Sequence, residues 1–231
     1  MAHPAACLFD LDGLLLDTEP LHAEAWQQAA QHFGRELTDG ELMQLRGRRR
    51  LDCADQVRLW IGAGGLEVPS PEALLAIRQP IAEALLIQAQ PMAGAQALVQ
   101  RCLDLALPMA LATSSSREAV LLKAQPHPWL EAIQERVHGD DPELKRGKPH
   151  PDVFQLAAQR LGVKCADSWA FEDSPAGAEA ACTNPETHLI GAVQPPAPSQ
   201  LHELAIRQLS TEVLGRLLPG LGMQGLSLIH I

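Results

Sequence analysis

Apolar and polar positions divide the chain into a short strand, a helical stretch, and a region where strands and helices alternate. Residues 5–9 (AACLF) are apolar up to Asp10, and the length of this run favours a buried strand. After Pro20, apolar side chains recur at helical spacing as far as Phe33, and Gly34 follows as a C-cap. Further helices are expected at residues 39–45, 51–61 and 72–88. Residues 20–88 are therefore predicted to form helices only.

From Pro91 onward, strand-like and helix-like stretches alternate. The pattern predicts strands at residues 108–112, 168–171 and 188–193. It predicts helices at residues 94–105, from Ser115 or Ser116 onward, and at 151–161, 174–181 and 211–218. Such alternation is typical of a parallel sheet that is covered by helices on both faces. The fold class is therefore α/β, with a parallel sheet core and an all-helical segment inserted after the first strand.

The change between these patterns sets the expected domain limits. We assign the α/β core to residues 1–16 and 89–220, which makes it discontinuous, and the helical insertion to residues 17–88. Residues 221–231 show no clear period, and we expect them to be disordered or foreign to the domain.

Composition and charge narrow the classes of function. The 231 residues are 46% hydrophobic and carry a net charge of −10. The one short basic cluster, at residues 46–50, does not predict a nucleic-acid partner. The five cysteines form no CxxC pair and are expected to be reduced thiols. Because no apolar run approaches about 18 residues and no signal peptide is evident, we expect a cytoplasmic protein without a membrane partner.

Two aspartates follow the first predicted strand. Ligands of parallel sheets bind beyond the carboxyl ends of the strands, and side chains two residues apart point the same way. Asp10 and Asp12 would repel each other there unless a cation held them, and a hard cation such as Mg²⁺ takes oxygen ligands. On the pair alone, the alternative that these residues only end the strand stays open.

Other strand ends and loops carry complementary groups. Thr113 and Ser114 follow the second strand, where a hydroxyl and free N–H groups could hold an anion or simply cap a helix. Lys148 lies in a proline-containing loop and suits a point-charge role against phosphate, although most loop lysines are only solvated. Glu172 and Asp173 form a second acidic corner after the strand at 168–171, where they could also cap the next helix.

Together these motifs resemble those of the haloacid dehalogenase superfamily. The stretches DLDGLLLDTE, GKPHPD and FEDSPAG look like the subgroup that contains β-phosphoglucomutase and many sugar-phosphate phosphatases, and the resemblance covers about residues 5–193. It implies a Rossmann-like core and a helical cap that closes over the site. The stretch CTNPETHLIGAV departs from the small-residue, glycine-containing turn that is usual in the family at this place.

The resemblance also implies roles for the motif residues. Asp10 would be the nucleophile that carries an aspartyl phosphate, and Asp12 the general acid and base. Mg²⁺ would be held by Asp10, the main-chain carbonyl of Asp12, and Asp173, with Glu172 nearby. The groups expected to bind the phosphoryl oxygens are those of Thr113, Ser114 and Lys148.

Cap residues are expected to contact the substrate. Glu19 and His22 match positions near the site entrance in the resembled subgroup, and Arg46 and Arg50 match a substrate-binding motif. The alternative for the arginines is a solvated helix end.

The sequence is compatible with three functions. The favoured one is a Mg²⁺-dependent phosphatase that acts on a small phosphorylated metabolite, such as a sugar phosphate, and works as a monomer or weak dimer. The second is a phosphosugar mutase of the β-phosphoglucomutase type. The third is a non-catalytic binding protein on the same fold. The sequence does not identify the substrate.

Overall fold

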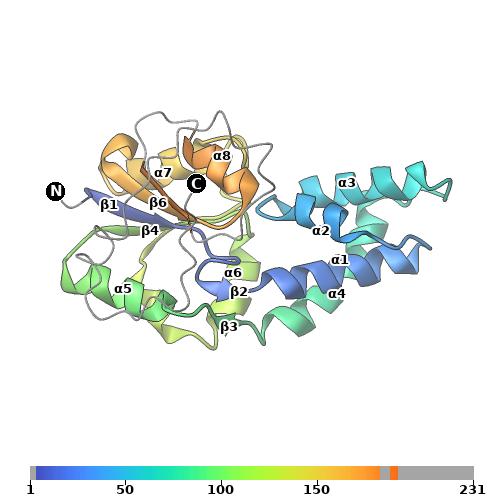
Figure 1. Ribbon diagram of the computed structural model, residues 1–231, viewed down its shortest axis with the longest axis horizontal. Coiled ribbons are helices and arrows are strands. Elements are labelled where there is room, and N and C mark those ends of the chain that lie inside the picture. Colours follow the sequence, from blue (N-terminus) through green and yellow to red (C-terminus); the bar gives the residue numbers. More distant parts are fainter. Residues whose placement is uncertain (1–3, 183–187, 192–231) are drawn as a thin grey trace.

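The computed structural model describes residues 4–182 and 188–191 and contains a five-stranded parallel sheet (Figure 1). The strand order is β5-β4-β1-β6-β7, so the first strand of the chain lies in the middle of the sheet. The strands are β1 (Ala6–Phe9), β4 (Met109–Ala112), β5 (Glu135–Val137), β6 (Ser168–Glu172) and β7 (His188–Gly191).

The central strand is apolar throughout because both of its faces are covered. Every residue of β1 is buried, and Cys7 pairs with Met109 of β4 on one side and with Trp169 of β6 on the other. A parallel strand buried on both faces reads as a continuous apolar run and does not alternate. This placement brings the carboxyl end of β1 between those of β4 and β6.

Helices cover both faces of the sheet, and we call the sheet with these helices the sheet domain. Residues of α5 and α6 pack with Phe9 and Phe171, whose rings stack at 4.8 Å, against one face. Residues of α7 and α8 pack with Leu8 against the other face (Figure 1). The helices are α5 (Ala95–Asp104), α6 (Arg117–Ala124), α7 (Asp152–Arg160) and α8 (Pro175–Cys182), and the short 3₁₀ turns are Pro128–Ala132 and Cys165–Asp167.

In the described part of the chain, four further helices extend away from the sheet domain, and we call them the helical segment (Figure 1). They are α1 (Glu19–His32), α2 (Asp39–Leu45), α3 (Arg50–Ala63) and α4 (Pro71–Leu86). The segment has its own apolar core, with Trp26, Val57 and Leu74 among the buried members. A short antiparallel pair, β2 (Leu16–Asp17) and β3 (Gln90–Pro91), joins its two ends to the sheet domain.

Local sequence signals explain where the helices of this segment begin. Thr38 and Glu41 form a capping box at the start of α2, and the Ser70 hydroxyl accepts the N–H of Ala73 at the start of α4.

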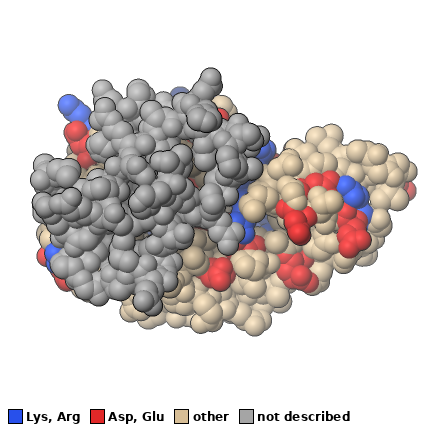
Figure 2. All heavy atoms as spheres, in the orientation of Figure 1, with Lys and Arg blue, Asp and Glu red and all other residues tan. Residues whose placement is uncertain are grey.

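On the face shown in Figure 2, Asp and Glu side chains are spread over the described surface. Lys and Arg atoms appear there at the junction with the helical segment.

The α/β fold class is confirmed, and the expected elements up to residue 181 occur within about two residues of their predicted limits. Three strands were not predicted. β5 is short and half-buried, and β2 and β3 have two residues each, so their patterns carry little signal. The helix expected at 211–218 and the tail at 221–231 lie outside the described residues. The domain limits stay a prediction.

Among the described residues, no helix combines the length and apolar character needed to cross a bilayer.

The packing of β1 predicts a large effect of one core truncation. Leu8→Ala removes a fully buried side chain from the face covered by α7 and α8, and should lower the free energy of unfolding by about 2–5 kcal/mol. Leu121→Ala, at a side chain that is 58% exposed on α6, should change it by less than about 0.5 kcal/mol. Urea denaturation measures both values, and equal losses would contradict the assignment of β1 to the core.

Candidate active site

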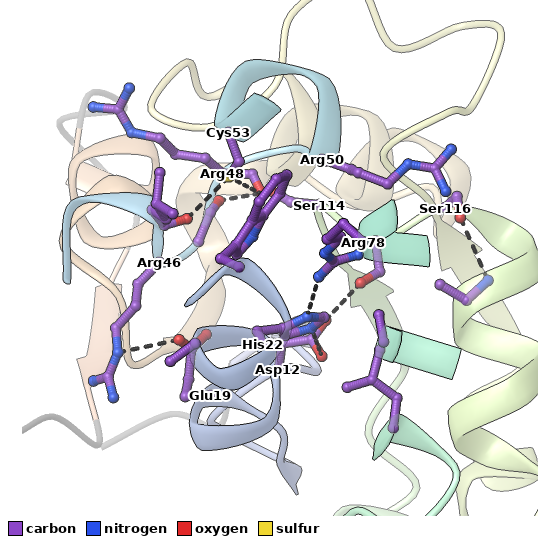
Figure 3. Close-up of a pocket in the computed structure, with 18 of the residues that line it drawn as sticks. Asp12, Glu19, His22, Arg46, Arg48, Arg50, Cys53, Arg78, Ser114 and Ser116 are labelled. Carbon is purple, nitrogen blue, oxygen red and sulfur yellow. Dashed lines mark hydrogen bonds and ion pairs between the residues drawn. The ribbon is translucent and has the colours of Figure 1, made fainter. Parts of the chain in front are cut away.

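A cavity of about 460 Å³ lies between the helical segment and the carboxyl edge of the sheet (Figure 3). Its wall includes Asp10 and Asp12 from the loop after β1, together with the Ser114–Ser116 loop after β4. The helical segment contributes a larger set of residues, among them Glu19, His22, Trp26, Arg46, Arg48, Arg50 and Arg78. The site therefore has a sheet side and a cap side.

On the sheet side, Lys148 joins two carboxylates at the carboxyl ends of the neighbouring strands β1 and β6. Its ammonium donates to Asp10 Oδ1 at 2.6 Å and also to Glu172 Oε1. The Lys148 side chain has no exposed area, and its Nζ lies 5.1 Å from the centre of the Phe154 ring. Glu172 is held further, because its Oε2 accepts the N–H groups of Asp173 and Ser174. Both carboxylates are thus fixed before any ligand binds.

Asp10, Glu172 and Asp173 form a group that could hold a metal ion. One oxygen of each carboxylate lies within 4.8 Å of the others, and Asp173 Oδ1 is buried without a hydrogen-bond partner. Burial, with the charge of Glu172, raises the pKa of Asp173 to about 10. Burial also raises the pKa of Asp10 to about 7, although Lys148 opposes this. A cluster of buried oxygen ligands with one atom unpaired fits a hard divalent cation.

Glycine is required at two positions beside this cluster. Gly13 has a φ of +82°, and a Cβ atom there would lie 2.1 Å from Asp173 Oδ2. A Cβ atom at Gly177, in α8, would lie 1.8 Å from Glu172 Oε1. The glycines of the DxDG and SPAG motifs therefore make room for the two acidic side chains.

The carboxylate of Asp12 accepts hydrogen bonds from both sides of the site. The hydroxyl of Thr18 donates to this carboxylate at 2.6 Å and the hydroxyl of Ser115 at 2.7 Å. The ammonium of Lys123 donates to both carboxylate oxygens, at 2.5 and 2.6 Å. His22 Nε2 lies 3.3 Å from it (Figure 3). Burial would favour the neutral acid, but Lys123 and His22 hold the pKa of Asp12 well below its usual value.

A cap arginine determines the tautomer of His22. Arg78 Nη2 lies 2.8 Å from His22 Nδ1, and because a guanidinium can only donate, Nδ1 must accept (Figure 3). Nε2 then carries the proton and donates to Asp12. Burial lowers the pKa of His22, which agrees with a neutral ring.

The remaining predicted residues on the sheet side lie in the loop after β4. Thr113 is fully buried, and its Oγ1 accepts the N–H of Ser115 at 3.1 Å. Ser114 lines the cavity, and its hydroxyl donates to the carbonyl of Gly47 in the helical segment at 2.8 Å. Gly47 has a φ of +71°, and a Cβ atom there would lie 2.0 Å from Ser174 Oγ. This loop therefore touches the helical segment directly.

The predicted cap residues line the cavity in different ways. Arg46 Nε lies 3.1 Å from a Glu19 carboxylate oxygen, so these two residues pair with each other. Burial raises the pKa of Glu19 to about 8, although Arg46 opposes this. Arg50 is exposed and donates to Gln79 at 2.7 Å. His22 lies in α1 of the helical segment, but its side chain contacts Asp12 on the sheet side.

Sequence reasoning missed four residues of this network, namely Thr18, Arg78, Ser115 and Lys123. Arg78 is 5% exposed, lies 4.7 Å above the Trp26 ring, and keeps a buried Nε without a partner. Lys123 has no exposed area. One signal was present, because Lys123 lies three residues after Val120 on the buried face of α6. A lysine on an apolar face needs a buried partner.

Comparison with known proteins decides the family. Residues 4–181 match the family model described as haloacid dehalogenase-like hydrolase. The chain belongs to this family. It is 36% identical over 179 residues to the probable pseudouridine-5'-phosphatase of Drosophila melanogaster, covering 76% of each chain. It is 33% identical over 179 residues to (DL)-glycerol-3-phosphatase 2 of Arabidopsis thaliana, covering 75% of this chain and 73% of that one.

A solved structure agrees with this assignment. A haloacid dehalogenase family hydrolase from Deinococcus radiodurans, with bound phosphate and sodium, is 27% identical and superposes with a TM-score of 0.64, covering 86% of this chain and 84% of that one. The predicted family and enzyme class, a haloacid dehalogenase-like phosphoric monoester hydrolase, are confirmed. The roles of individual site residues stay predictions.

Two glycines provide a matched test of the acidic cluster. Gly13→Ala and Gly65→Ala both place a side chain at positive φ, and this backbone strain alone should cost each variant about 1–2 kcal/mol of stability. Only Gly13→Ala intrudes on Asp173, because a Cβ atom at Gly65 meets nothing within 4 Å. Thermal unfolding with and without Mg²⁺ should show stabilisation by the ion in wild type and Gly65→Ala, but not in Gly13→Ala. An unchanged Mg²⁺ response in Gly13→Ala would contradict the metal site.

Proposed function

We propose that this protein is a Mg²⁺-dependent phosphatase that hydrolyses a small phosphorylated metabolite through an aspartyl phosphate on Asp10. The observation that carries the proposal is the position of Asp10, which is paired with buried Lys148, joins the acidic cluster and borders the cavity. The names of the two relatives, a pseudouridine-5'-phosphatase and a glycerol-3-phosphatase, support a small phosphorylated substrate. A cavity of about 460 Å³ suits a ligand of this size.

The first half of the reaction transfers the phosphoryl group to the enzyme. An oxygen of Asp10 attacks phosphorus, the bond between phosphorus and the substrate oxygen breaks, and the leaving oxygen takes a proton from Asp12. Asp10, Asp173 and the main-chain carbonyl of Asp12 would hold Mg²⁺, with Glu172 beside them, and the bound ion supplies neutralisation of the phosphoryl charge.

The second half releases phosphate. A water oxygen attacks phosphorus, its proton goes to Asp12, and the bond between phosphorus and Asp10 breaks, which returns the Asp10 carboxylate. Lys148, Thr113 and the N–H of Ser114 would stabilise the charge on the phosphoryl oxygens. On the cap side, we assign substrate contacts to Glu19, His22, Arg46 and Arg50. We add Arg78 to these proposed substrate-contacting residues because it is buried beside His22.

A substrate panel tests the reaction. With Mg²⁺, the wild type should release phosphate from at least one sugar, polyol or nucleoside monophosphate, and EDTA should abolish the activity. Asp10→Asn should lower kcat by about 10³-fold or more because it removes the nucleophile. Asp104→Asn, at the exposed end of α5, should have no effect.

Two outcomes of the panel would contradict phosphate hydrolysis. Conversion of a hexose 1-phosphate without phosphate release, primed by a bisphosphate, would instead support the mutase function. Failure of the wild type on every substrate, with Asp10→Asn no different, would support a non-catalytic binding protein.

A lysine pair tests the phosphate-binding role. Lys148→Ala should lower kcat by about 10²–10³-fold, because it removes the buried cation that faces Asp10 and the transferred group. Lys145→Ala, at an exposed lysine three residues earlier, should leave kcat unchanged. Steady-state kinetics on the substrate found in the panel measures both, with circular dichroism as the check on folding. Near-wild-type turnover of Lys148→Ala would exclude the assigned role.

A further inference from the structure

Lys123 makes contacts that none of the assigned roles explains. It lies in the last turn of α6, its side chain has no exposed area, and its ammonium bonds both oxygens of Asp12, at 2.5 and 2.6 Å. A third contact, at 2.7 Å, runs to Ser115 Oγ. An ammonium has three N–H groups, so all of them are used within this cluster.

These contacts separate Lys123 from the substrate. Of the described residues, the cavity wall includes Ser115 and Leu122 but not Lys123. With every donor engaged and no exposed area, Lys123 can act on the reaction only through Asp12 and Ser115. Any part it plays in catalysis is therefore that of a positioning residue.

The contact geometry does more than neutralise a charge. Lys123 reaches both oxygens of Asp12, and Ser115 donates to Oδ2 at 2.7 Å, so the contacts fix the plane of the carboxylate as well as its charge. By contrast, Lys148 contacts one oxygen each of Asp10 and Glu172. The two buried lysines thus serve different carboxylates in different ways.

The Lys123 contacts also stay within the sheet domain. Asp12 follows β1, Ser115 lies in the loop after β4, and Lys123 lies in α6. The other donors to Asp12 are Thr18 and His22, which lie at the start of the helical segment. The orientation that Lys123 gives to Asp12 therefore does not depend on contacts with the helical segment.

We propose that Lys123, together with Ser115, positions the Asp12 carboxylate as the proton acceptor for the water that hydrolyses the phosphoenzyme. The inference rests on the proposed phosphatase function. In the step concerned, the water oxygen bonds to phosphorus and one water proton passes to an Asp12 oxygen. The bond between phosphorus and Asp10 breaks, so the products are inorganic phosphate and the Asp10 carboxylate. Among the described residues, hydrogen-bond donors contact both Asp12 oxygens. They keep the carboxylate in the ionised form that a proton acceptor requires.

An aryl phosphate separates this step from the one before it. With p-nitrophenyl phosphate the leaving group needs no proton, so formation of the phosphoenzyme does not require Asp12 as an acid. kcat/KM then reports phosphoryl transfer to Asp10, whereas kcat also includes hydrolysis of the phosphoenzyme. A defect confined to the second step lowers kcat alone.

Lys123→Met should therefore lower kcat for p-nitrophenyl phosphate by about 100-fold and change kcat/KM by less than about threefold. Rapid mixing should show a burst of about one nitrophenolate per enzyme before the slow steady state, and acid-quenched protein should carry phosphate. Lys164→Met, at an exposed lysine before β6, should match the wild type in every measurement. Ser115→Ala should show the same pattern with a smaller fall in kcat, and it carries the test if Lys123→Met does not fold.

Three results would overturn the assignment. If kcat and kcat/KM fall together without a burst, Lys123 supports the site as a whole and not the hydrolysis step. If kcat is unchanged, Lys123 does not position Asp12. If Ser115→Ala folds and lowers kcat/KM as much as kcat, then Ser115 also supports the site as a whole and not the hydrolysis step. A wild type that releases no nitrophenolate with Mg²⁺ would instead overturn the proposed phosphatase function, and the inference with it.

Discussion

The site depends on the contact between buried carboxylates and two fully buried lysines. Asp10, Glu172 and Asp173 crowd the carboxyl edge of the sheet, and burial raises the pKa of Asp10 and of Asp173. The positive charge of Lys148 is paired with the carboxylates of Asp10 and Glu172, and that of Lys123 with the carboxylate of Asp12. Breaking a buried ion pair leaves an uncompensated charge, so the acidic residues and the lysines require each other.

The order of the strands makes this contact possible. Because β1 lies between β4 and β6, the loop that holds Asp10 and Asp12 has a strand end on either side. β6 ends at Glu172, and Asp173 directly follows it. The connection after β4 supplies Ser115 and leads into the helix that carries Lys123. The apolar residues that bury β1 on both faces therefore also determine which polar groups meet at its end.

Sequence reasoning located the residues that directly follow apolar strands. Asp10 and Glu172 each end an apolar run, so the parallel topology predicts that they lie at the same edge of the sheet. The strand order places them side by side, and Lys148 joins them. Lys123 and Arg78 could not be placed in the same way. Both lie within helices, and their burial depends on how α6 and α4 pack against other elements. Two-residue strands such as β2 are likewise set by tertiary contacts and not by local pattern.

The hydrogen bond from Ser114 to Gly47 joins the sheet domain to the helical segment through a main-chain carbonyl. No side chain of the segment takes part, and the glycine is needed only for its conformation and its lack of a Cβ atom. Replacement of the neighbouring arginines would therefore leave this hydrogen bond in place. Substitutions at the arginines of the cavity wall would change the charge that a ligand meets there, while the hydrogen bond that joins the two parts of the enzyme stays in place.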